Sequence, residues 1–485
     1  MRTTIRDVTL LAIDSDSPYL VPPFGPVHAE VTAEDLDIIA GEVPRDLDGV
    51  YLRTGPNPRV LASGRPHWFD GDGMIHGAEI RDGRITYRNR WVDTTGLGME
   101  LDAGAAIWPG LMSPPDRSLK MAWGSDHFLK DASNTDVAVY QGGAVSTFYQ
   151  CGDAYRIDAR TLETKGTIEL PRMGVRSMSA HPKADEQTGE LLFFDYDSKP
   201  PYMTYGVLAP DGSLRHHVAI DLPGARLPHD MAITENYTIL HDLPLFWDPK
   251  LLARDIHKVT FYPDMPSRFG IIPRYGKGDS IRWFEADPCY IYHTVNAWED
   301  GDEIVMIACR HMEPEPRRNL GDTEFSRMMA WLRMDATLRR WRFNLKTGEV
   351  KEEILDDLNS EFPTINGLMT GRKSRYCYNV TIADHDVLWF DGLIKYDLET
   401  GRSDRYRLPE GWMLSESPFA PRKGSRAEDD GYVISYATES ASGKSEVLIF
   451  DAQNISTGPI CRAAVPQRIP PGFHSCWVRG ETIPA

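Results

Sequence analysis

Four histidines lie where short apolar runs of the sequence begin or end, positions at which a β-sheet would hold a metal ligand in place. A lone histidine in such a setting is more often a structural residue than a ligand, so spacing alone favours metal binding for none of them. Together, the set leads to the hypothesis that four distant imidazoles converge on one metal ion. The four are His181 in Ser-Ala-His-Pro, His229 in Leu-Pro-His-Asp, His293 in Ile-Tyr-His-Thr and His474 in Gly-Phe-His-Ser.

The ligand type restricts the choice of metal if all four histidines bind one ion. Neutral imidazoles leave a 2+ charge uncompensated, so carboxylates are expected around them. Structural zinc fills a closed tetrahedral site, usually with thiolates. An octahedral Fe(II) with four nitrogen ligands keeps two positions open for O₂ and for water or substrate, although two histidines and one carboxylate are the more usual set. The pattern therefore favours iron and oxygen chemistry.

The segments that carry these histidines read as strands in a β-rich chain. Runs of four to eight β-branched and aromatic residues alternate with turn signals, and Asp-Gly pairs predict hairpins. The predicted hairpin turns are Asp82-Gly83, Asp211-Gly212 and Asp300-Gly301. Helix patterns are few and short, and the candidates are Gly98 to Leu111, Pro249 to His257 and Glu324 to Met329.

A faint internal repeat suggests how the strands are arranged. The segments Tyr155–Thr161, Trp341–Thr347 and Ile394–Thr400 each place Asp or Asn three residues before Thr. The last two lie about 50 residues apart, which suits one propeller blade with a loop, but the same pattern is also a common hairpin turn. A β-propeller would bring its inner strands to one axis, where ligands distant in sequence can meet.

The whole chain gives no sign of division into domains. No Pro/Ser/Gly linker interrupts the 485 residues, so we expect one domain over residues 1–485, with residues 1–45, rich in proline and acidic residues, as an ordered arm over its surface. The six scattered cysteines and the absence of a signal-peptide pattern predict reduced thiols in the cytoplasm.

Net charge and the lengths of the apolar runs argue against two classes of partner, nucleic acids and membranes. With 71 acidic and 53 basic residues the net charge is −18, which makes nucleic acid an improbable partner. No apolar run is long enough to span a membrane. Pro244–Trp247 is a candidate for membrane contact, but ordinary packing is the favoured interpretation, so no obligatory membrane association is expected.

Ordered motifs along most of the chain resemble those of a known family. They include Gly49–Pro58, His67–Met74, the motifs around His181, His229 and His474, Glu361-Phe362-Pro363 and Glu416–Arg422. On these motifs the chain is similar to the carotenoid cleavage oxygenases, and within them it looks most like the bacterial and fungal lignostilbene dioxygenases. The glycine-rich turns within the first two motifs have a structural role only.

The resemblance implies a fold, a cofactor and a reaction. The fold would be all-β, a seven-bladed β-propeller with a helix-and-loop cap over one face. One Fe(II) would be held by His181, His229, His293 and His474, with Glu361 and Glu416 accepting hydrogen bonds from ligand imidazoles. O₂ would be the co-substrate, no organic cofactor would be needed, and one alkene C=C bond would be cleaved to two aldehydes.

Two positions depart from the family pattern. Gln150 stands where a third glutamate is usual, and it can accept a hydrogen bond but carries no charge. Tyr149 stands where stilbene-cleaving relatives have a lysine that binds the substrate's phenol, and Lys130 is a possible substitute.

Because of these departures, the sequence does not identify the substrate. We expect a lignin-derived stilbene, and an apocarotenoid or carotenoid is the alternative. Either would be a small conjugated molecule. A non-catalytic propeller that serves as a binding scaffold is the alternative from another class. The oligomeric state is open, a dimer included.

Overall fold

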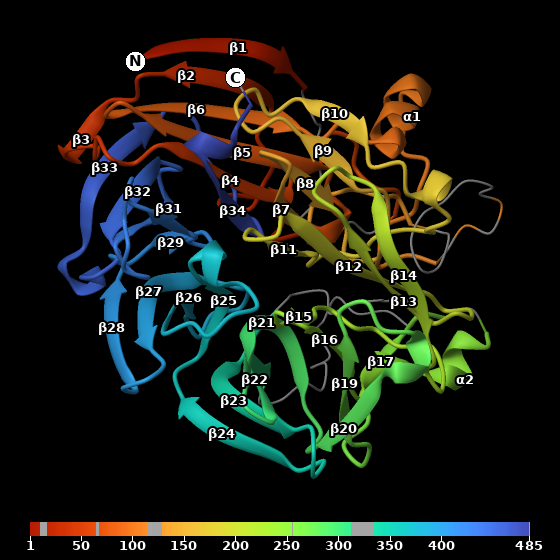
Figure 1. The fold of residues 1–485 in the computed structure, drawn as a ribbon. Coiled ribbons are helices and arrows are strands. Elements are labelled where there is room, and N and C mark those ends of the chain that lie inside the picture. Colours follow the sequence, from red (N-terminus) through yellow and green to blue (C-terminus); the bar gives the residue numbers. More distant parts are fainter. Residues whose placement is uncertain are drawn as a thin grey trace.

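Seven antiparallel sheets of four or more strands surround a central axis in the described part of the chain (Figure 1). The structure is a computed structural model, and it describes residues 1–9, 17–64, 67–114, 116, 118, 129–254, 256–311 and 333–484. The arrangement is the seven-bladed β-propeller that the resemblance implied.

Both ends of the chain meet in the first blade, so that the ring is closed by pairing of C-terminal and N-terminal strands. From the outside inward, the first blade contains β1 (Arg2–Val8), β2 (Ala29–Glu34), β6 (Arg84–Trp91), β5 (Gly73–Arg81), β4 (Gly49–Pro56) and β34 (Ser475–Arg479). β34 runs antiparallel to β4, with Cys476 opposite Leu52. Gly49 is opposite Arg479 in this pairing, and a Cβ atom on Gly49 would lie 2.4 Å from the indole ring of Trp477.

The next three blades follow one another in sequence, and each begins at its innermost strand and ends at its outermost. From the outside inward, the second contains β10 (Thr164–Thr167), β9 (Tyr155–Ile157), β8 (Gly143–Thr147) and β7 (Asp136–Tyr140). The third contains β14 (Leu214–Ile220), β13 (Met203–Leu208), β12 (Glu190–Tyr196) and β11 (Lys183–Asp185). The fourth contains β20 (Arg282–Ala286), β19 (Ser267–Pro273), β16 (Tyr237–Asp242) and β15 (Ala232–Ile233).

The last three blades continue the ring back to the first. From the outside inward, the fifth contains β24 (Val350–Asp356), β23 (Ala336–Asn344), β22 (Glu303–His311) and β21 (Tyr290–Asp300). The sixth contains β28 (Arg402–Arg407), β27 (Phe390–Asp397), β26 (Tyr376–Ile382) and β25 (Ser360–Thr364). The seventh contains β3 (Ile38–Gly41), β33 (Pro459–Val465), β32 (Ser445–Asp451), β31 (Gly431–Glu439) and β29 (Trp412–Leu414), and β30 (Phe419–Pro421) also pairs with β31.

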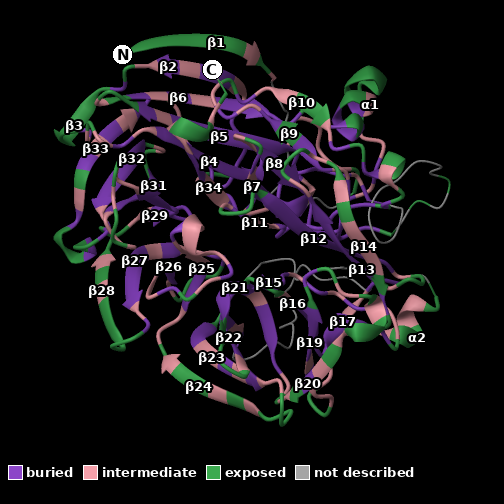
Figure 2. Cartoon of the chain, viewed as in Figure 1, coloured by how far each residue is buried: buried purple, intermediate pink, exposed green. Residues whose placement is uncertain are grey.

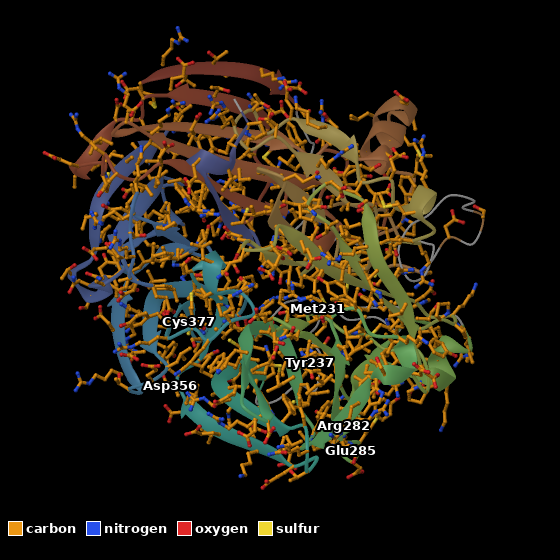
Figure 3. The ribbon with its side chains drawn as sticks, viewed as in Figure 1. Met231, Tyr237, Arg282, Glu285, Asp356 and Cys377 are labelled. Carbon is orange, nitrogen blue, oxygen red and sulfur yellow. The ribbon has the colours of Figure 1, made fainter. Side chains whose placement is uncertain are left out.

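Burial increases from the outer strands toward the axis (Figure 2). Figure 3 illustrates this in the fourth blade, where Met231 lies near the axis and Arg282 and Glu285 lie on the outer strand β20. The core consists of apolar side chains packed between adjacent blades, as where Tyr51 of β4 meets Tyr436 of β31 with ring centroids 4.7 Å apart. Tight blade-to-blade packing holds the inner strands in fixed positions.

The N-terminal segment 1–45 belongs to two blades. β1 and β2 extend the first blade, and β3 pairs with β33 as the outermost strand of the seventh. The predicted surface arm thus supplies strands to the first and the seventh blades, which are neighbours in the ring.

All three predicted hairpin turns are confirmed, because each joins consecutive strands of one blade. The helices differ from prediction. α1 spans Thr95–Ala103, so it overlaps the predicted range but begins and ends earlier than predicted. α2 is limited to Pro249–Leu252. The candidate at Glu324 to Met329 lies outside the described residues. The 3₁₀ turns are η1 (Trp68–Asp70), η2 (Leu170–Met173), η3 (Gly278–Ser280), η4 (Gly367–Met369), η5 (Ile455–Thr457) and η6 (Gly480–Thr482).

Three further expectations concern the surface and the thiols. The segment proposed for membrane contact forms β17 (Leu245–Trp247), which pairs with β18 (Val259–Phe261) and is buried, so ordinary packing is the correct interpretation. None of the helices among the described residues combines the length and apolarity that crossing a bilayer requires. All six cysteines are free thiols. The cytoplasmic location inferred from the sequence stays a prediction.

Candidate metal centre

The four histidines come from four blades and lie at the beginnings of inner strands. His474 immediately precedes β34, His181 and His229 lie just before β11 and β15, and His293 is the fourth residue of β21. Since each inner strand begins beside the axis, the propeller brings together four residues that the sequence scatters. Each imidazole is attached to a strand that is packed on its outer side by the rest of its blade.

The imidazoles converge closely enough for one ion. The ring centroid of His181 lies 4.6 Å from that of His229, 5.1 Å from that of His293 and 4.5 Å from that of His474. The Nε2 atoms of His181 and His229 are 3.1 Å apart. Ligand atoms of His181, His229 and His293 lie within 4.8 Å of one another, the spacing expected around a single metal.

Burial keeps two of the four rings neutral, which suits metal binding. Burial lowers the pKa of His181 and of His229 well below the ordinary value, so both rings are neutral and have a lone pair available. The Nε2 atom of His293 is buried and has no hydrogen-bond partner, although its Nδ1 atom is bonded. A buried ring nitrogen without a partner is costly unless an ion occupies the space it faces, so the residues fit a metal.

Glu361 orients His293 from the sixth blade. Its Oε2 atom accepts a hydrogen bond from His293 Nδ1 at 2.5 Å, and its Oε1 atom accepts one from Nε2 of His311 at 3.3 Å. Burial acts to raise the pKa of Glu361, but the two histidines outweigh it and lower the pKa to about 2. The carboxylate is therefore charged, and it directs the other nitrogen of His293 toward the axis.

Glu416 does the same for His474 from the seventh blade. Its Oε1 atom accepts a hydrogen bond from His474 Nδ1 at 2.9 Å, while its Oε2 atom accepts bonds from the amide and hydroxyl of Ser475. Burial acts to lower the pKa of His474, but Glu416 reverses the effect and raises it. Both glutamates that the resemblance singled out thus contact imidazoles of the four-histidine cluster.

A third carboxylate, Asp136 at the start of β7, also faces the centre. Its Oδ2 atom accepts a hydrogen bond from the backbone N–H of His181 at 3.0 Å, and the residue groups with His181 and His474 within 4.8 Å. His181 has a φ of 64°, an unusual backbone conformation for a histidine. The bond from Asp136 holds this strained residue in place.

Sequence reasoning missed Asp136 and His311 as parts of the centre. A usable signal was present for each, because both are polar residues at one end of an otherwise apolar strand. Asp136 begins the apolar run of β7, and His311 ends β22, whose Ile304–Cys309 segment is wholly buried. A polar group at such a position needs a partner, which distinguishes it from an ordinary strand residue.

The residues that depart from the family pattern lie in and around the turn after β8. Tyr149 and Gln150 are both buried there, and the ring of Tyr149 packs edge-on against Phe69 with centroids 5.2 Å apart. Lys130 lines a small cavity together with Leu129 and Phe148, and its ammonium group is paired with the carboxylates of Asp72 and Glu100.

Two different environments adjoin the histidines. Aromatic side chains from loops and η1 form one buried cluster with Phe362, whose ring stacks on His474 with centroids 4.8 Å apart. The residues that follow the histidines in sequence instead line a pocket of about 210 Å³ with both charged and apolar side chains, which His181, His293 and His474 reach. An apolar wall on one side suits a flat conjugated molecule. The pocket on the other side brings charged side chains, among them Asp136, Lys183 and Glu416, close to the histidines. The other members of the aromatic cluster include Trp68, Phe69, Phe148, Tyr149 and Phe473.

Comparison with known proteins agrees with this geometry. Residues 24–479 match the family model described as retinal pigment epithelial membrane protein. The carotenoid 9,10(9',10')-cleavage dioxygenase 1 of Arabidopsis thaliana is 36% identical over 510 residues, which cover 99% of this chain and 93% of that protein.

Two solved structures show the same fold. The lignostilbene dioxygenase of Pseudomonas brassicacearum superposes with a TM-score of 0.83 at 26% identity, covering 97% of this chain and 100% of the other. The cobalt-substituted apocarotenoid oxygenase of Synechocystis gives a TM-score of 0.79 at 26% identity, covering 93% and 96%.

Proposed function

This chain belongs to the carotenoid cleavage oxygenase family, and we propose that it is a non-haem Fe(II) dioxygenase that cleaves one C=C bond of a conjugated small molecule with O₂. The observation that carries the proposal is the convergence of four imidazoles, with the buried Nε2 atom of His293 left without a partner. We assign His181, His229, His293 and His474 as the iron ligands. Bound Fe(II) would supply open coordination positions at which O₂ becomes reactive toward an alkene.

The protein's own residues orient the ligands and enclose the substrate. Glu361 and Glu416 hold the Nδ1 protons of His293 and His474, which leaves the Nε2 lone pairs directed at the centre. The glutamates and Asp136 place negative charge near the ion, while Gln150 adds none. The aromatic cluster around Phe69 and Phe473 excludes water and provides flat surfaces for a conjugated chain.

For the substrate we propose an apocarotenoid or carotenoid. The 36% identity to a carotenoid-cleaving enzyme over nearly the whole chain supports this choice. The placement of Lys130 supports it too, because its ammonium group pairs with Asp72 and Glu100 and so is not available to a phenol. We propose that Tyr149 contacts the substrate, and that Lys130 only supports the wall at Leu129 and Phe148, with which it lines a small cavity.

A stilbene-type phenylpropanoid is the second candidate. Its support is the TM-score of 0.83 with a lignostilbene dioxygenase, which exceeds the 0.79 found with the apocarotenoid oxygenase. The hydroxyl of Tyr149 is the feature that could meet a phenol at this site.

The test is anaerobic reconstitution with Fe(II), followed by a mixed panel of apocarotenals and 4-hydroxystilbenes under ¹⁸O₂. We expect two carbonyl products from an apocarotenal, each with one ¹⁸O atom, detected by mass spectrometry. Products from the stilbenes alone would establish the second candidate. A protein that retains no iron and consumes no O₂ with any substrate would be a binding scaffold, and the proposal would be wrong. The matched control is the His293→Ala protein, for which we expect neither iron retention nor product.

A further inference from the structure

The carboxylate of Asp230 is surrounded by donors from three blades. Asp230 directly follows His229, and its side chain is 1% exposed. Its Oδ2 atom accepts hydrogen bonds from the amide and the hydroxyl of Thr294, both at 2.7 Å. Its Oδ1 atom accepts one from the amide of Met231 at 2.7 Å and forms an ion pair with Nζ of Lys183 at 2.6 Å. Figure 3 shows Met231 beside the axis of the propeller.

Each of these partners is a near neighbour in sequence of a candidate ligand. Lys183 is the second residue after His181, and Thr294 is the next residue after His293. One carboxylate therefore links the segments that carry three of the four histidines, across two blade boundaries. No described hydrogen bond joins Asp230 to an imidazole, so its role differs from that of Glu361 and Glu416.

The same kind of contact recurs at two other blade boundaries. Asp136 of the second blade accepts the backbone N–H of His181 in the third, and Glu416 of the seventh accepts the backbone N–H of Ser475 in the first. In each case a carboxylate on one blade fixes the backbone beside a histidine on the next. Asp230 is the member of this set that joins three segments, because Lys183 adds a contact in the opposite direction round the ring.

We propose that Asp230 and Lys183 act as a positioning pair that fixes His181, His229 and His293 relative to one another and so raises the affinity of the centre for a divalent metal. This inference rests on the proposed metal site. Metal ligands must be held within about 0.5 Å of their productive positions, and residues around them provide that precision. Asp230 is suited to the task because all four of its contacts are to groups within three blades that meet at the axis.

The principal test is the affinity of the metal-free protein for Co(II), followed by the visible absorption of the bound ion. Lys183→Met removes the ammonium group but keeps the length of the side chain. We expect its Co(II) affinity to fall by about 10–100-fold and the absorption spectrum to change, as for other residues that orient ligands. Lys183→Arg restores a cation and should recover most of the affinity.

The chain offers a matched control at another buried ion pair. Lys395 of β27 pairs with Asp429 at 2.6 Å, and its side chain is 9% exposed, but it lies in the sixth blade and contacts no histidine among the described hydrogen bonds and ion pairs. We expect Lys395→Met to lower the melting temperature while leaving Co(II) affinity and spectrum unchanged. Equal losses of affinity in the two methionine variants would mean that general destabilisation is the cause, and would overturn the proposal.

A second variant keeps the test decisive if Lys183→Met does not fold. Thr294→Val removes one hydroxyl donor at nearly constant volume, and we expect a smaller decrease in Co(II) affinity with the same direction of spectral change. Unchanged affinity in a folded Lys183→Met or Thr294→Val protein would refute the positioning role and leave the proposed function intact. A wild-type protein that binds neither Co(II) nor Fe(II) would instead refute the metal site itself, and the positioning role with it.

Discussion

Glu361 connects two histidines, and only one of them is a proposed ligand. Its charge would balance that of a bound ion and its Oε2 atom holds His293, whereas its contact with His311 at 3.3 Å fixes the carboxylate itself. Glu361→Gln should therefore weaken iron binding by about 10–100-fold, because the amide orients His293 less strongly and brings no charge. Iron content after gel filtration and circular dichroism of the same samples would check this. An unfolded variant, or one with full iron content, would contradict the assigned role.

Asp131 provides a prediction about pH. It is fully buried, and burial together with the nearby Asp153 raises its pKa to about 8. A raised pKa means that the folded protein binds this proton more tightly than the unfolded chain does. The stabilisation is complete below the ordinary carboxyl pKa of 3.8 and is lost as the pH rises through about 8.

We therefore expect the unfolding free energy of wild type to decrease from about pH 4 to pH 8 relative to that of Asp131→Asn, which cannot ionise. Urea denaturation of both proteins at several pH values measures the difference. Parallel pH profiles would show that Asp131 is already ionised in the folded state.

For single residues, the sequence predicted the histidines and glutamates that the structure brings together, because motifs of specific residue types identify them. It did not reveal Asp136, Asp230 or His311, since their partners come from blades that are distant in sequence. Lys130 shows the same limit. Its role depends on Asp72 and Glu100, which only the fold places beside it.

Among the secondary-structure elements, the repeated Asp/Asn-x-x-Thr segment is a hairpin turn that recurs at the same position in several blades. In the second, fifth and sixth blades it joins the two outermost strands. The side chains of Asp158, Asn344 and Asp397 each accept backbone N–H bonds from the residues two and three positions later. The two interpretations open from the sequence are therefore compatible, because one hairpin turn recurs at the same place in each of these blades.

This turn supplies a prediction about stability. Asn344→Ala removes an acceptor for two backbone N–H groups, at 3.0 Å and 2.9 Å, and should lower the unfolding free energy by about 1 kcal/mol. Lys346→Ala in the same turn removes only an exposed ion pair with Asp302 and should change it by less than about 0.5 kcal/mol. Thermal melts of both variants distinguish the effects. An equal change in the two would mean that the Asn344 side chain contributes nothing specific.

The helices were harder to place than the strands. α1 begins at Thr95 because the hydroxyl of Thr94 accepts the N–H of Leu97, and it ends at Gly104, whose φ is 65°. The sequence prediction begins later, at Gly98, because the apolar pattern is weak and does not reveal the Thr94 cap. Hairpins were located better, since an Asp-Gly pair specifies the turn locally, without any tertiary contact.

For the whole molecule, the four proposed ligands would tie four blades to a single ion. Fe(II) that binds the folded protein alone should raise the unfolding free energy by RT ln(1 + [L]/Kd), about 2.7 kcal/mol at a free concentration of 100 Kd. Calorimetry of metal-free and Fe(II)-loaded protein under nitrogen would show a higher melting temperature for the loaded form. His229→Ala should lose this increase together with turnover. If that variant keeps both, the four-histidine assignment is wrong.

The overall architecture was predictable because strand patterns, turn signals and family motifs agree along the chain. The substrate was less predictable from the sequence. The motifs suggested stilbene cleavage, whereas the similarity to a carotenoid-cleaving enzyme and the ion pairs of Lys130 favour an apocarotenoid. The choice between these substrates depends on where side chains such as Lys130 and Tyr149 lie in the fold. Such placement is a property of the closed ring, which no single segment specifies.

The pairing of β34 with β4 has a consequence for the order in which the protein is made. His474 and the strand that closes the ring lie close to the C-terminus. A ribosome therefore synthesises every strand of the other six blades before the fourth imidazole and the last inner strand of the first blade. Until His474 has been synthesised, the proposed metal centre lacks one of its four ligands, so we expect a chain that stops before His474 to bind iron only weakly.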